Sequence, residues 1–98
     1  MITITAVIRA KPAQADALQE ALCAVADYVA ANEPGTVGFH ISQDLSDPSV
    51  FTTFERFTSE DAKDRHNSSP AVAAFFGKAD ALIDGPVILH TCREVSEK

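Results

Sequence analysis

Hydrophobic and polar positions divide the first third of the chain into a strand and a helix. Residues 2–10 are rich in β-branched side chains and predict a strand, which ends at Lys11 because Pro12 cannot donate to a β-ladder. Pro12 suits the first turn of a helix. From there to about Ala31, apolar residues recur at helical spacing opposite an acidic face. These apolar positions are Leu18, Leu22, Val25 and Val29.

The middle of the chain has the pattern of a β-hairpin. Residues 32–36 combine helix-stopping and turn-forming types, and apolar residues alternate over 37–41, which predicts a second strand. A polar turn at 44–48 precedes residues 50–57, which predict a third strand paired with the second.

A short helix is predicted from about Glu60 to Asn67. Thr58 and Asp61 resemble a capping box, and Ser59 is an alternative cap for the same helix.

A further helical segment starts at Ser69-Pro70 and ends at Gly85-Pro86, and residues 87–92 predict the last strand. The order is therefore β-α-β-β-α-β, with the second helix in two pieces. This order defines an α+β, ferredoxin-like fold with an antiparallel sheet and both helices on one face.

Residues 1–98 form a single domain, since this length leaves no room for a second one.

The other face of the sheet also carries apolar side chains. Phe54 lies on the opposite parity from Phe51 and Phe57 in the third strand, and the last strand is apolar on both parities. We therefore expect both faces to be largely buried, the second against another copy of the chain in a homodimer. A ligand cavity is expected between the sheet and the helices or near the interface.

Composition and charge restrict the class of protein. Hydrophobic residues make up 46% and charged residues 22%, which is typical of a soluble globular domain. The formal charge of −6 argues against nucleic acid or an anionic membrane as the main partner. The N-terminal residues do not resemble a signal peptide, and no apolar run approaches the length of a membrane helix, so a cytoplasmic location is expected.

Sequence motifs for familiar chemistry are absent. The chain has no phosphate-binding, dinucleotide-binding, zinc-protease or serine-hydrolase motif. Cys23 and Cys92 are far apart and are expected to be unrelated free thiols. Three histidines without short mutual spacing give little support for a metal site.

The remaining candidates for chemistry are His66 and Glu55. His66 lies near the end of the short helix. There it either transfers protons or donates a hydrogen bond to a bound molecule, or it complements the helix dipole or simply lies in solvent. Glu55 shares its parity with Phe51 and Phe57, so it projects toward an apolar environment. There it either exchanges protons with a ligand or forms a salt bridge to an Arg or Lys.

Other candidates would line a pocket. His40 and His90 lie on strands and either face a pocket together or are ordinary sheet residues. Phenylalanines either pack the core or line a cavity for a flat aromatic molecule. The residues predicted to line the substrate pocket are Phe39, His40, Phe51, Phe57, Phe76 and His90.

Several segments together resemble the antibiotic biosynthesis monooxygenase family. They are Glu33 to Phe39, Phe51 to Phe57, and Ser59 to Ala62 followed by His66 and Ser69-Pro70. The resemblance spans nearly the whole chain and implies a dimeric α+β barrel. It also implies that Glu55 and His66 are the family's recurring strand Glu and helix His. Phe57 stands where many members have Trp or another aromatic residue, and the absence of a Trp here weakens mechanisms that need an indole, including haem degradation.

The resemblance implies a monooxygenase that uses no metal or organic cofactor. Its substrates would be O₂ and a small aromatic phenol or quinol, deprotonated by His66 or Glu55 in an apolar pocket. Two alternatives stay open. One is an isomerase of a small polar carbonyl compound, and the other is a non-catalytic ligand-binding dimer, since fold does not dictate function.

Overall fold

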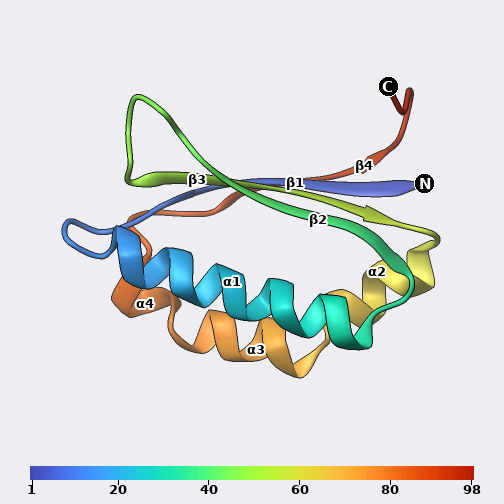
Figure 1. Ribbon diagram of the computed structural model, residues 1–98, viewed down its shortest axis with the longest axis horizontal. Coiled ribbons are helices and arrows are strands. Elements are labelled where there is room, and N and C mark those ends of the chain that lie inside the picture. Colours follow the sequence, from blue (N-terminus) through green and yellow to red (C-terminus); the bar gives the residue numbers. More distant parts are fainter.

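A four-stranded antiparallel sheet with all helices on one face forms the architecture of the computed structural model, which describes residues 1–98 (Figure 1). The spatial order of the strands is β2-β3-β1-β4. The strands are β1 (Ile2–Arg9), β2 (Thr36–Gln43), β3 (Val50–Phe57) and β4 (Ile88–Arg93). The helices are α1 (Ala15–Asn32), α2 (Glu60–Asn67), α3 (Pro70–Gly77) and α4 (Ala79–Leu82). The predicted α+β fold with its β-α-β-β-α-β order is therefore confirmed.

The register of the two central strands decides which side chains meet the helices. β1 and β3 pair antiparallel, with Ile4 opposite Glu55 and Thr5 opposite Phe54. Ile4 and Glu55 are buried beneath the helices, whereas Thr5 and Phe54 are exposed on the other face. Because side chains alternate along a strand, the parity predicted for Glu55 is confirmed.

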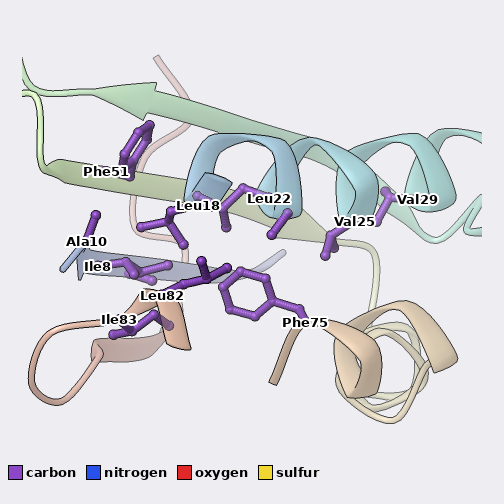
Figure 2. Packing of buried hydrophobic residues seen from close by; sticks show 12 residues of the cluster. Ile8, Ala10, Leu18, Leu22, Val25, Val29, Phe51, Phe75, Leu82 and Ile83 are labelled. Atoms are coloured by element: carbon purple, nitrogen blue, oxygen red, sulfur yellow. The ribbon is translucent and has the colours of Figure 1, made fainter. Parts of the chain in front are cut away.

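The hydrophobic core lies between α1 and the sheet. One cluster joins the buried stripe of α1 to β1, β3 and α3, and Figure 2 shows Leu22 and Val25 of α1 in this cluster with Ile8 and Phe75. The predicted apolar face of α1 is fully buried, and Leu18 has no exposed area. A smaller cluster of Ile4, Phe57 and Ala62 fills the space beneath α2. These two clusters fix both ends of the helical layer on the sheet.

The first helix begins later than the proline signal indicates. Pro12 lies in a turn, α1 starts at Ala15, and Ala13 has a positive φ of 65°. The Gln14 amide donates to the Lys11 carbonyl and closes that turn. The left-handed backbone at Ala13 is incompatible with a helix, which is why Pro12 does not occupy its first turn.

Two serine caps divide the second helical region. The Ser59 hydroxyl accepts from the Ala62 amide at 3.1 Å, and the Ser69 hydroxyl accepts from the Val72 amide at 3.2 Å. Ser59 is therefore the cap of α2, rather than Thr58 in a capping box. The region contains three helices instead of the two expected pieces, since α4 follows α3 after Lys78.

The outer face of the sheet, opposite the helices, is open in the single chain (Figure 1). Val7, Phe54 and Ile88 are 36%, 42% and 56% exposed on it, and every residue of β4 is exposed. The expectation that both faces are largely buried therefore does not hold for one chain alone. None of the helices combines the length and the apolar character that crossing a membrane requires.

Substituting Leu18 by alanine tests the position of the core. We expect Leu18→Ala to lower the free energy of unfolding by about 2–5 kcal/mol, because it leaves a cavity beneath α1. The neighbouring Gln19 is exposed, so Gln19→Ala is a matched control that should change stability by less than about 0.5 kcal/mol. Urea denaturation followed by circular dichroism measures both, and equal effects would contradict this packing.

Candidate functional site

A buried histidine is the centre of the candidate site. His66 lies in the last turn of α2 and is only 3% exposed. Its ring packs between those of Phe39 from β2 and Phe57 from β3, with centroids 5.5 Å and 5.4 Å away. The Ser59 cap fixes where α2 begins, and this start places His66 one helical turn beyond Ala62 on the buried side. The interpretation of His66 as a solvent-facing residue is therefore wrong.

Both ring nitrogens of His66 face carboxylates. Nδ1 lies 2.8 Å from Oε1 of Glu33, and Nε2 lies 3.2 Å from Oε1 of Glu55. The Nδ1 contact is a hydrogen bond, and the Nε2 contact lies within ion-pair distance. An ionised carboxylate oxygen only accepts, so each contact is favourable only with a proton on the histidine nitrogen. His66 therefore satisfies both contacts only as an imidazolium, which forms an ion pair with each side.

Two threonines also donate hydrogen bonds to the glutamates. The Thr53 hydroxyl donates to Oε2 of Glu55 at 2.8 Å, and the Thr36 hydroxyl donates to Oε1 of Glu33 at 2.8 Å. Oε2 of Glu33 is buried without a hydrogen-bond partner. The salt bridge of Glu55 to an Arg or Lys is not formed, because its partner is His66. We call these three charged side chains, Glu33, His66 and Glu55, the charge cluster.

The charge cluster changes the acid strength of His66. Burial lowers the pKa of His66, but its interactions with the accepting carboxylates of Glu55 and Glu33, reinforced by their charges, outweigh burial, and the net effect raises the pKa above its ordinary value. The structure thus favours the protonated form that its geometry requires.

A close backbone approach brings the two halves of the charge cluster together. Glu33 follows α1, and Gly35 two residues later lies against α2. A Cβ at Gly35 would lie 2.7 Å from Cβ of Ala62, closer than such atoms are found. The Thr58 amide also donates to the Gly35 carbonyl at 2.9 Å. The glycine therefore permits the short distance between the segment carrying Glu33 and the helix carrying His66.

An apolar cavity of about 70 Å³ lies between the sheet and the helices beside the charge cluster. Of its 15 lining residues, 11 are hydrophobic, and the four others come from β3 and α2: Thr53, Glu55, His66 and Asn67. Phe76 and Leu89, which are 55% and 50% exposed, also line it and form its outer part. The predicted cavity between sheet and helices is present, and Glu55 and His66 both face it.

A separate polar hollow of about 370 Å³ lies on another side of the charge cluster. Glu33 lines it together with Arg65, Tyr28 and Asn32, whereas Glu55 and His66 do not. The charge cluster thus touches the apolar cavity at one end and the polar hollow at the other.

The predicted pocket residues are only partly brought together. Phe39 and Phe76 line the cavity. Phe51 and Phe57 do not, because both are fully buried in the two core clusters, although Phe57 contacts His66. The prediction that these two line the pocket is therefore wrong, because both belong to the core on which the site rests.

His40 and His90 are placed away from the cavity. Both are exposed on the outer face, where His40 stacks on Phe54 with centroids 6.3 Å apart. His90 pairs with Thr5, which also faces outward. The prediction that they line the pocket is wrong, since their neighbours Phe39 and Leu89 occupy the inward parity of the same strands.

Glu33 is the site residue that the sequence reasoning missed. It lies in a Glu-Pro-Gly-Thr segment whose composition indicates a turn, and it is 33 residues from His66 along the chain. Among His, Cys, Asp and Glu side chains, no group of three is placed to hold a metal ion. Cys23 and Cys92 are exposed, free thiols.

The chain belongs to the antibiotic biosynthesis monooxygenase family, whose model matches residues 1–78. No curated protein matches it.

Solved structures share the fold over nearly their whole length. The Pseudomonas aeruginosa protein PA3566 is 25% identical, with a TM-score of 0.86 over 97% of this chain and 94% of that one. A Nitrosomonas europaea protein of unknown function, NE2512, is 25% identical, with a TM-score of 0.87 over 99% and 91%. A candidate antibiotic biosynthesis monooxygenase of Caulobacter crescentus is 22% identical, with a TM-score of 0.89 over 97% and 90%.

The raised pKa of His66 makes its contribution to stability dependent on pH. Protonated His66 stabilises the fold fully below its unfolded-state pKa of about 6.5, and this contribution is lost as pH rises through the higher folded-state pKa. We therefore expect the stability difference between wild type and His66→Gln to be largest in mild acid and to shrink toward alkaline pH.

Urea titrations of both proteins from pH 5 to 9, repeated at low and high salt, measure this difference. Because the ion pairs are buried, salt should change it little. A difference that does not vary with pH would contradict the charge cluster as described.

Proposed function

We propose that the protein is a monooxygenase that oxidises a small electron-rich phenol or quinol with O₂ and needs no metal or organic cofactor. The observation that carries the proposal is the pair Glu55 and His66, a buried acid-base couple facing a mostly apolar cavity. Membership of the monooxygenase family adds support.

The reaction uses the substrate as its own reductant. The substrate AH₂ gives one proton to the Glu55–His66 pair and becomes the anion AH⁻, which transfers one electron to O₂. The substrate radical and superoxide combine into a peroxide, which recovers the proton as AHOOH. The O–O bond then breaks, the second hydrogen leaves as a proton with the departing hydroxide, and A=O forms. The balance is AH₂ + O₂ → A=O + H₂O.

The protein contributes orientation, charge and exclusion of water. The apolar lining strengthens the attraction between the imidazolium of His66 and the substrate anion, since the local dielectric is low. Phe39 both packs against His66 and lines the cavity, so it is positioned to stack on a flat ring.

The volume of the cavity limits its occupants. An apolar cavity of roughly 150 Å³ is known to admit benzene, and this one has about 70 Å³. An aromatic substrate therefore enters only after a side chain at the outer part of the cavity moves. Phe76 is suited to this movement because it is 55% exposed and lies on the surface side of α3.

A non-catalytic ligand-binding dimer is the second candidate. The small cavity favours it, because about 70 Å³ does not hold an aromatic substrate of the proposed reaction unless a side chain moves. Isomerisation of a polar carbonyl compound is less supported, since neither His40, His90 nor any arginine lines the cavity.

We also propose that the functional unit is a homodimer that covers the outer face. Val7 lies directly opposite Ile88 across β1 and β4, and Phe54 lies beside Thr5 on the same face. All three apolar side chains are exposed in the single chain, and a second sheet packed on them would remove them from water.

Replacing the carboxylate of Glu55 tests the oxygenase. With metal-stripped protein and a panel of anthrones, phenols and hydroquinones, we expect O₂ uptake. The mass of the product should exceed that of the substrate by one oxygen atom less two hydrogen atoms. Glu55→Gln keeps the shape but removes the base, so we expect turnover to fall roughly 10²–10⁴-fold.

Glu20→Gln, at an exposed position on α1, is the matched control and should keep full turnover. If the wild type takes up no O₂ with any member of the panel, the oxygenase proposal is refuted and the ligand-binding dimer is favoured. Undiminished turnover by Glu55→Gln would remove Glu55 from the reaction.

Introducing a charge on the outer face tests the dimer. At micromolar concentration we expect the wild type to sediment with twice the chain mass and Phe54→Glu to sediment as a monomer, because a buried unpaired carboxylate is costly. Leu45 lies in the exposed β2–β3 turn, so Leu45→Glu should leave the dimer intact. A monomeric wild type would refute the proposal.

A further inference from the structure

Glu33 has no part in the proposed reaction, although it makes the shorter of the two contacts to His66. Its Oε1 lies 2.8 Å from Nδ1, whereas Glu55 lies 3.2 Å from Nε2. Its side chain is only 9% exposed, and its Oε2 is buried without a partner. Burying a carboxylate in this way is costly, so its presence calls for a function.

We propose that Glu33 is a positioning residue that keeps both nitrogens of His66 protonated, so that Glu55 is the base and His66 is a fixed cation. The role in catalysis rests on the proposed function, whereas the effect of Glu33 on the protons of His66 stands without it.

With both glutamates ionised, the contacts of His66 disfavour its two neutral forms. With a proton only on Nε2, the lone pair of Nδ1 would face Oε1 of Glu33 at 2.8 Å, and both atoms would be acceptors. With a proton only on Nδ1, the lone pair of Nε2 would face Oε1 of Glu55 at 3.2 Å. Only the imidazolium donates to both carboxylates.

An imidazolium has no lone pair and cannot take a proton from a substrate. The proton acceptor facing the cavity is then Glu55, whose carboxylate accepts a hydrogen bond from Thr53, pairs with His66 and retains further lone pairs. The choice between His66 and Glu55 as the base, which the sequence leaves open, is thereby assigned to Glu55. His66 instead stabilises the negative charge that forms on the substrate.

The position of Glu33 suits this division of roles. Two carboxylates and one imidazolium leave a surplus negative charge, which would repel a substrate anion if it lay at the cavity. Glu33 lines the polar hollow with Arg65 and does not line the cavity. From β2 and β3, the apolar rings of Phe39 and Phe57 also pack against His66. The cavity therefore receives the His66 cation together with its partner Glu55, and the surplus charge of Glu33 lies toward the hollow.

Nuclear magnetic resonance of the histidine nitrogens tests the proposal without any substrate. In ¹⁵N-labelled wild type at pH 7, both nitrogens of His66 should show the shifts of protonated nitrogens. In Glu33→Gln, which keeps the size and an acceptor oxygen, we expect His66 to lose one proton and to titrate at lower pH.

Thr36→Val is the matched control, since it removes the other hydrogen bond to Oε1 of Glu33 but leaves the charge. His66 should remain doubly protonated in it. A wild-type His66 with a single proton at pH 7 overturns the proposal even if no variant folds, and so does a Glu33→Gln protein whose His66 titrates as in the wild type.

Kinetics with a substrate found in the panel tests the catalytic part. We expect Glu33→Gln to lower kcat roughly 10–100-fold with little change in KM, because the lost cation acts on the transition state. Unchanged kcat despite the altered protonation would overturn the assigned roles. Absence of turnover in the wild type, with the expected nitrogen shifts, would instead refute the oxygenase and support the effect of Glu33 on His66.

Discussion

A buried imidazolium held between two carboxylates is the interaction on which the rest of the site depends. It joins three parts of the chain that are distant in sequence: the segment after α1, strand β3 and the last turn of α2. Removing one member would leave a buried charge without its partner, and broken pairs of this kind are strongly destabilising. The cluster therefore links the position of α2 on the sheet to the charge presented to the cavity.

The ferredoxin-like fold supplies two different surfaces from one sheet. The inner face carries the core and, at the end beneath α2, the polar pair Thr53 and Glu55 on the same parity as buried Phe51. The outer face carries exposed apolar side chains and both histidines that have no part in the site. Because alternation along a strand separates these faces, a substitution on the outer face leaves the side chains of the inner face in place.

The sequence predicted the elements well because their signals are local. Alternation in β3 placed Glu55 inward, and the start signal near Glu60 placed His66 at the end of a short helix. The contact between these two residues and the involvement of Glu33 depend on tertiary packing, which no local pattern records. His40 was misplaced although the alternation of Phe39 and Ile41 already indicated the outward parity. The start of α1 was misplaced because Pro12 fits a turn as readily as a first helical turn.

Gly35 shows how a residue without chemistry limits a site. Loops at the surface usually tolerate substitution, because little packs against them. Here a single added methyl would press on Ala62 and push α2 away from the segment that carries Glu33. The spacing of two charges is thus held by the absence of a side chain, and this turn has the low mutational tolerance of a core position.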